Sequence, residues 1–273
     1  MRSTLVAFLL LASACDLGDV SAPLPPADDV DADVTPPPGD EPDADVPPPA
    51  TGRVTLGLQA IYEFGEGSGA LVGDTSNVGL ACDLDIASPG LVTWRPTGLR
   101  IDATTIARNG GPATKIYDAC TASNEITVEA WVTPASLTTG GVAARIAGMS
   151  LDPATRNFSI IQTDADYSFR LRTGATDLNG IPATTAPAAV TILPQHLVYT
   201  RDALGQARLY VDNVEKAQAI VGDTFINWAP TYEMVIANEA TLNRPWLGEL
   251  HLVAVYCRAL TLAEVGQNFA ESY

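Results

Sequence analysis

Apolar and polar residues alternate along much of the chain after about residue 53. The segment ITVEAWV at residues 126–132 shows the pattern most clearly. Successive side chains of a strand point to opposite faces, so this segment would have one apolar face and one mixed face. The apolar face would carry Ile126, Val128, Ala130 and Val132, and the mixed face Thr127, Glu129 and Trp131.

Other segments repeat this alternation between turn-forming residues. We expect single strands at 58–64, 232–237 and 249–256. We also expect two hairpins, 158–162 with 167–173 around the turn TDAD, and 196–201 with 207–213 around DALGQ. Many short strands with almost no helical periodicity predict an all-β fold, a two-sheet antiparallel sandwich.

One helix is predicted near the end of the chain. Thr261 is a suitable N-cap, and Glu264 three residues later completes a capping box. The helix would run to about Asn268.

The first residues have the pattern of an export signal. Arg2 precedes a short apolar run at 5–11, which is too short for a membrane-spanning helix of about 20 residues. Small residues then precede Cys15, as in a lipobox, which predicts a signal peptide at 1–14 and lipid attachment at Cys15. The run Ala12-Ser13-Ala14 also fits ordinary cleavage, which would give a secreted protein instead.

Residues 15–52 read as a tether. Residues 16–52 hold ten Asp or Glu, ten Pro and no Lys, Arg or aromatic residue. Like charges repel, Pro removes backbone donors, and nothing there can form a core, so we expect an extended disordered segment. It would serve as a stalk or as a solubilising spacer. The folded domain would then be 53–273.

The charge balance excludes some classes of partner. The chain has a formal net charge of −17, and the domain keeps 22 acidic against 14 basic residues. No basic cluster is evident in the sequence, so nucleic acid and anionic lipid surfaces are poor candidates. Any membrane contact would come through the N-terminal lipid, and we expect a monomer.

Three cysteines lie in the domain, at Cys82, Cys120 and Cys257. An exported protein tends to pair its cysteines, and three pairings are possible. Cys82 and Cys120 lie in turn-like polar surroundings, whereas Cys257 lies in an apolar strand. We therefore expect a Cys82–Cys120 disulfide and a buried Cys257 thiol.

Several segments together resemble the laminin-G-like domains of the concanavalin A-like lectin/glucanase superfamily. In order they are IYEFGEGSG with Asp74-Thr75-Ser76, ITVEAWV, RNFSIIQ with YSFRLRT, HLVYTRDALGQARLYVDN, and the closing RPWLGELHLVAVYCRALTLAEVGQNF. The resemblance covers nearly all of 57–273. It implies a jelly-roll sandwich that binds glycans or surface proteins, in the setting of a bacterial surface lipoprotein. The fold leaves the ligand open, because members differ widely.

The resemblance also raises the question of calcium. Related domains often hold Ca²⁺ with an Asp of the last strand, in a run resembling G-x-I-D-E. Here His251 replaces that Asp and Leu252 the following Glu, and imidazole is a poor calcium ligand. Asp74, Asn238 and Glu239 remain as candidates for a rim site. The alternatives are an Asx-turn for Asp74 and loop solvation for the other two.

The sequence offers little support for catalysis. The superfamily's lytic members carry a tight E-x-D-x-x-E-type cluster, and Glu125 and Glu129 are separated only by Ile, Thr and Val. His196 and His251 have no neighbouring metal-ligand cluster. We therefore expect a non-enzymatic protein, with each histidine hydrogen-bonded within a sheet.

Aromatic and basic residues provide the candidates for ligand binding. Four tryptophans, Trp94, Trp131, Trp228 and Trp246, could stack on sugars or pack in the core. Trp131 is the best platform, because it shares a face with Thr127 and Glu129. Arg170 and Arg172 alternate with Phe169 and Leu171, so they share a sheet face that could bind acidic sugars or a protein carboxylate. The sequence thus predicts a recognition module for a glycan or glycoconjugate. The alternatives are a structural or protein-interaction module of an envelope assembly and, third, a glycan-active hydrolase.

Overall fold

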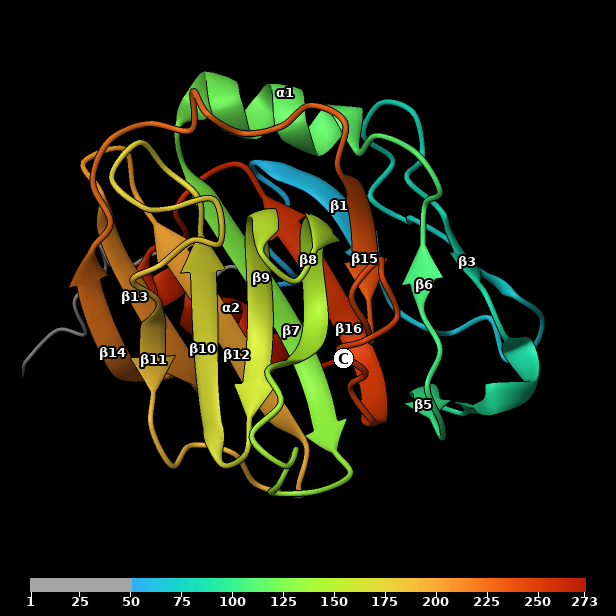
Figure 1. Cartoon of the computed structure of the whole chain (residues 1–273). Helices are drawn as coiled ribbons and strands as arrows, with labels where there is room; N and C mark the ends of the chain where they lie inside the picture. Colours follow the sequence, from blue (N-terminus) through green and yellow to red (C-terminus); the bar gives the residue numbers. More distant parts are fainter. Residues whose placement is uncertain (1–50) are drawn as a thin grey trace, which may run out of the picture. The chain divides into compact units, whose positions relative to one another are not determined.

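The computed structural model describes residues 51–273, which form two antiparallel sheets packed face to face (Figure 1). The predicted all-β sandwich is confirmed. The predicted signal peptide, the lipid-bearing Cys15 and most of the tether lie outside the described residues. Within residues 51–273, neither helix has the length and apolar character needed to cross a bilayer.

Sheet A has the strand order β14-β13-β12-β7-β16-β5-β4, with β1 also paired to β16. Its strands are β1 (Leu58–Tyr62), β4 (Val92–Arg95), β5 (Gly98–Ile101), β7 (Ile126–Pro134), β12 (Gln195–Arg201), β13 (Gln206–Val211), β14 (Val214–Ile220) and β16 (Gly248–Tyr256). The central pair β7 and β16 is buried along almost its whole length.

Sheet B has the order β11-β10-β9-β8-β15-β6-β3-β2 and lies in front in Figure 1. Its strands are β2 (Leu71–Val72), β3 (Leu84–Ile86), β6 (Ala107–Arg108), β8 (Ala144–Asp152), β9 (Thr155–Thr163), β10 (Asp166–Leu171), β11 (Thr184–Ala186) and β15 (Glu233–Ile236). Both predicted hairpins are present, as β9–β10 and β12–β13.

The main core lies between the two sheets and is built by the alternation seen in the sequence. Ile126, Val128, Ala130 and Val132 all face it, as predicted for that strand. From sheet B, Phe158 and Phe169 pack against it, and Phe169 stacks on Tyr199 with ring centroids 3.7 Å apart. Burying these apolar side chains is the dominant force that holds the sheets together.

The predicted C-terminal helix is α2 (Leu262–Glu271). The capping box forms as expected, since the Thr261 side chain accepts from the Glu264 amide and the Glu264 carboxylate accepts from the Thr261 amide. The helix lies on the outer face of sheet A, on the far side of the molecule in Figure 1.

A second helix, α1 (Thr114–Ser123), was not predicted. Its sequence TKIYDACTAS is rich in residues of low helix propensity, and Ala113 at its N-cap makes no side-chain cap. Tertiary contacts hold it instead, since Ile116 and Cys120 are buried against the core. It spans one end of the sandwich (Figure 1).

The predicted Cys82–Cys120 disulfide is wrong, because Cys120 is bonded to Cys257. The apolar strand β16 ends at Tyr256, so Cys257 follows it at the point where α1 crosses the sandwich. The bond therefore joins α1 to the end of a central strand, across 137 residues of sequence. Cys82 is the buried free thiol, and burial raises its pKa.

Candidate functional site

The outer face of sheet A is covered by the two ends of the folded domain. Helix α2 packs there through Val265 and Phe269, which join a second apolar cluster with Trp131, Val198 and Tyr210. The chain before β1 adds Val54 and Leu58 to the same cluster. The central strands β7, β12 and β16 are therefore covered on this face.

Glu129 anchors these ends. Its side chain is fully buried and lies 2.8 Å from both His196 Nε2 and Asn268 Nδ2, and it forms an ion pair with Arg53. Burial raises the pKa of Glu129, but His196 and Arg53 more than offset that effect, so the pKa lies below its ordinary value. Glu129 thus joins sheet A to α2 and to the chain that leads into β1.

The Glu125 and Glu129 side chains do not form a pair flanking a cleft. Glu125 accepts hydrogen bonds from the backbone amides of Ala203 and Ala259, which ties neighbouring loops together. Both carboxylates therefore have structural partners in the described part of the chain.

Trp131 is not an exposed sugar platform. It is only 7% exposed, and it stacks on His196 and Phe269 with centroid distances of 4.7 and 5.6 Å. The predicted exposure of Trp131 overlooked Phe269 and Tyr273, which pack on the indole. These residues are far from Trp131 in the sequence and reach it only in the folded protein. Trp228 and Trp246 are also buried, at 3% and 1% exposed.

The outer face of sheet B is different, because no helix among residues 51–273 crosses it (Figure 1). Strand register aligns Arg170 with Ser159 and Ser159 with Gly148, in one row across three strands. Glycine is needed at position 148, because a Cβ there would lie only 2.5 Å from Ser159 Oγ. The row is therefore lined by small residues, with Arg170 at one end.

Arg145 and Arg156 lie beside this row and are buried. Both share the carboxylate of Glu239, with N–O distances of 3.1 Å from Arg145 Nε and 3.7 Å from Arg156 Nη1. Burial lowers the pKa of Arg145 to about 10 and that of Arg156 to about 9. The register shift near Ser150 places Arg156 opposite it, and Arg156 Nη1 lies 3.3 Å from Ser159 Oγ.

Arg170, Arg172 and Arg244 are partly exposed and form no ion pair within the described residues. Arg170 donates to Asn179 Oδ1 at 2.8 Å, whereas the Nε atoms of all three guanidiniums are buried without an acceptor among residues 51–273. Arg244 is close enough for its charge to lower the pKa of both Arg145 and Arg170, after the larger effect of burial. We call Arg145, Arg156, Arg170 and Arg244 the arginine face.

The three predicted metal ligands do not form one oxygen cluster. Asp74 accepts from the amides of Ile61, Ser76 and Cys82, and it forms an ion pair with Lys115. The alternative of an Asx-turn is thus supported in part, because the Ser76 amide, two residues on, donates to Asp74 Oδ1.

Asn238 and Glu239 belong to a different network. Asn238 donates to Thr105 O and accepts from the Arg244 amide, while Glu239 pairs with arginines. Across residues 51–273, no group of three or more His, Cys, Asp or Glu side chains is placed to hold a metal ion. These residues do not fit a calcium site, because cations already occupy the Asp74 and Glu239 carboxylates.

His251, which stands where relatives have Asp, is buried and hydrogen-bonded. Its Nε2 lies 2.9 Å from Thr133 Oγ1 and its Nδ1 lies 2.8 Å from Thr97 O. Gly98 permits this approach, since a Cβ there would lie 2.9 Å from His251 Nδ1. The imidazole thus has a structural role between β5 and β7.

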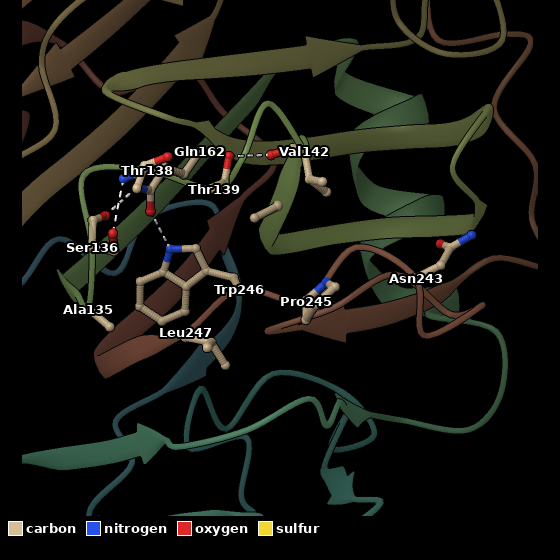
Figure 2. A pocket seen from close by; sticks show the side chains of 11 residues that line it. Ala135, Ser136, Thr138, Thr139, Val142, Gln162, Asn243, Pro245, Trp246 and Leu247 are labelled. Carbon is tan, nitrogen blue, oxygen red and sulfur yellow. Dashed lines mark hydrogen bonds between the residues drawn. The ribbon is translucent and has the colours of Figure 1, made fainter.

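A pocket of about 350 Å³ opens at one end of the sandwich (Figure 2). Asn243, Pro245, Trp246 and Leu247 lie along one side, and Thr138, Thr139 and Gln162 lie across from them. Trp246 Nε1 donates to Gln162 Oε1 at 2.8 Å, so the indole is fixed at its edge. Arg244 lies between two lining residues, so the segment 243–246 contributes to both the pocket and the arginine face.

The fold is that of a lectin-like β-sandwich. Residues 108–266 match the family described as the concanavalin A-like lectin/glucanases superfamily, Laminin G 3. This match covers more than half of the chain, and the chain belongs to that family. A comparison with curated proteins found no match.

Solved structures share the fold at low sequence identity. The binding domain of botulinum neurotoxin DC in complex with rat synaptotagmin II has a TM-score of 0.60 and 11% identity, over 81% of this chain and 53% of that one. Trypanosoma rangeli sialidase in complex with sialic acid has a TM-score of 0.55 and 18% identity, over 78% and 32%. A third structure is of botulinum neurotoxin type C and is described by the dependence of that toxin's cell entry on two ganglioside molecules. It has a TM-score of 0.57 and 9% identity, over 80% of this chain and 52% of that one.

The chain therefore spans between about a third and about half of the length of these structures. At such identities the likeness establishes the fold alone.

Proposed function

We propose that this protein is a non-enzymatic recognition module that binds a glycan or glycoconjugate on the outer face of sheet B. The observation that carries the proposal is the contrast between the two outer faces. Helix α2 and both ends of the folded domain cover the central strands of sheet A, whereas sheet B presents partly exposed arginines and small polar residues. A binding site needs such an accessible surface with donors that the protein itself leaves unpaired.

The structural relatives support a binding role. Two of them are described with gangliosides or sialic acid, and one in complex with rat synaptotagmin II. For this chain we infer the same general task, with adhesion or substrate tethering at a cell surface as its purpose. The structural partners of Glu125 and Glu129 support a non-enzymatic role, because each carboxylate is engaged in joining segments of the fold.

The export pattern at the N-terminus supports a place for this task. We propose an exported lipoprotein, anchored through Cys15 and carrying the domain at the cell envelope, with secretion as the alternative. Globomycin treatment of expressing cells distinguishes the two, because it blocks maturation of lipid-bearing precursors only. A processed, lipid-free product in treated cells would contradict the anchor.

A broad glycan array tests the recognition proposal, with the protein applied once in calcium and once in EDTA. We expect binding that EDTA does not remove, since the candidate calcium ligands are paired with Lys115 and with arginines. Binding lost in EDTA would restore calcium as a cofactor. No binding in either buffer would overturn the glycan proposal and favour the alternative, a module that binds proteins of an envelope assembly.

A further inference from the structure

The arginine face is positively charged, although the domain as a whole is acidic. Arg145 and Arg156 share the Glu239 carboxylate, and the Arg145 amide donates to the Arg244 carbonyl at 3.0 Å. Arg170 is in register with Ser159, whose Oγ lies 3.3 Å from Arg156 Nη1. Like charges this close repel one another, and the low exposure of Arg145 and Arg156 limits screening by water. The group therefore favours an additional negative charge.

Three carboxylates oppose the charge of this group. Besides Glu239, only Asp152 and Asp177 rank among the main opposing charges, acting on Arg156 and Arg170 respectively. Both Asp side chains also accept backbone amide bonds in their own turns. Asp152 and Asp177 therefore already have partners of their own, which leaves the arginines open to a further carboxylate.

The geometry favours a planar anion. Arg156 is fully buried, and the Nε atoms of Arg156, Arg170 and Arg244 are buried without an acceptor among residues 51–273, so a ligand would meet only Nη atoms. A guanidinium presents its donors in a flat fork that matches a carboxylate with two parallel hydrogen bonds. Arg170 and Arg244 are partly exposed, so their outer donors are the ones a ligand would meet.

Uncharged polar side chains flank the cationic group. Ser168 lies on the same face of β10 as Arg170 and is paired in register with Thr185 on the edge strand β11. Thr185 is exposed and Ser168 partly exposed. Such hydroxyls suit sugar hydroxyls, whereas a dense polyanion would meet repulsion from the acidic residues elsewhere on the domain.

We propose that the arginine face selects glycans that carry one carboxylate-bearing sugar among neutral sugars. The carboxylate is held by Arg170 and Arg244, with Arg145 and Arg156 supplying buried charge behind them, and adjacent sugar hydroxyls meet Ser168 and Thr185. This inference rests on the proposed glycan-binding function and names its ligand class.

Paired glycans test it directly. The full chain is measured by calorimetry against oligosaccharides containing one uronic or sialic acid, and against the same oligosaccharides after reduction of the carboxyl to an alcohol. We expect the acidic member to bind at least about tenfold more tightly, because a charge-assisted pair of hydrogen bonds is lost on reduction. Arg244→Gln and Arg170→Gln should each remove at least about tenfold of that affinity.

Two controls keep the result interpretable. Arg208→Gln removes an arginine of strand β13 in sheet A that pairs with Glu215, and should leave affinity unchanged. Arg244→Lys keeps the charge without the fork, and should recover only part of the affinity. Thermal unfolding of each variant shows whether it is folded.

The outcomes separate this inference from the proposed function. Equal binding of acidic and reduced glycans, unaffected by Arg244→Gln, would overturn the carboxylate site and leave glycan recognition standing. Equal binding of a short Glu-containing peptide, with no preference for sugar, would overturn the glycan function and favour protein carboxylates. Absence of binding to every oligosaccharide and to the peptide would overturn both.

Discussion

Replacing Glu129 with alanine should destabilise the protein strongly without affecting ligand binding by the folded fraction. The carboxylate is fully buried and bonded to His196 and Asn268 at 2.8 Å each, and it pairs with Arg53. Removing it leaves buried donors unpaired on three separate segments. Loss of one partner of a buried ion pair costs about 3–5 kcal/mol, and Glu129→Gln, which keeps the shape, should cost about 1.5–3 kcal/mol.

Urea unfolding followed by tryptophan fluorescence measures these losses, since Trp131 lies beside His196 under the same cover. Glu125→Ala is the matched control on the same part of the chain, and should cost under about 1 kcal/mol because it removes bonds to loop amides only. Equal effects of Glu129→Ala and Glu125→Ala would refute the anchoring role. Loss of glycan binding in a folded Glu129→Gln protein would show that sheet A takes part in recognition.

Three further outcomes follow from packing, cross-linking and charge. Cys120→Ser should lower the free energy of unfolding by up to about 5 kcal/mol, because the lost bond closes a span of 137 residues, while Cys82→Ser should leave the melting temperature nearly unchanged. Gly148→Ala should cost about 1–3 kcal/mol by overpacking, measured in urea, since its Cβ would lie 2.5 Å from Ser159 Oγ; a neutral result would show that the row has spare room. Burial raises the pKa of Asp74, but hydrogen bonds to the carboxylate outweigh burial and bring the pKa below 3.8. The carboxylate therefore stabilises the fold above about pH 4, and this contribution is lost as the pH falls through the pKa of the folded state. Urea midpoints between pH 2 and 6 should therefore fall less steeply in Asp74→Asn than in the parent.

The strands were predictable because each depends on a pattern local to it. Alternation placed Val128 and Val132 in the core and Trp131 on the opposite face, and the capping box located α2. Helix α1 could not be found in this way, since its residues have low helix propensity and its burial comes from contacts with distant strands.

The site was predictable only in part. Alternation with Phe169 and Leu171 indicated that Arg170 and Arg172 share a face, and the register of β10 agrees for Arg170. The involvement of Arg145 and Arg244 depends on pairing between strands and loops about a hundred residues apart, which no local pattern records.

The Cys120–Cys257 pairing was missed for a related reason. Turn-like polar surroundings favoured Cys82 as the partner of Cys120, whereas the fold buries Cys82 as a free thiol. The Tyr62 hydroxyl donates to the Cys82 carbonyl at 2.7 Å. Helix α1 crosses the sandwich at the end of β16, and this places Cys120 beside Cys257.

Both ends of the folded domain pack on the outer face of sheet A, and this has a practical consequence for experiments. Gly52 O accepts from Gln267, and the Val54 amide donates to Asn268, so the chain enters the fold beside α2, where it also finishes. A biotin, a fluorophore or a chip linkage added at either end would therefore be attached on the sheet A side. Immobilised molecules would be oriented with the arginine face toward the solution, and one surface preparation would serve for comparing all of the variants.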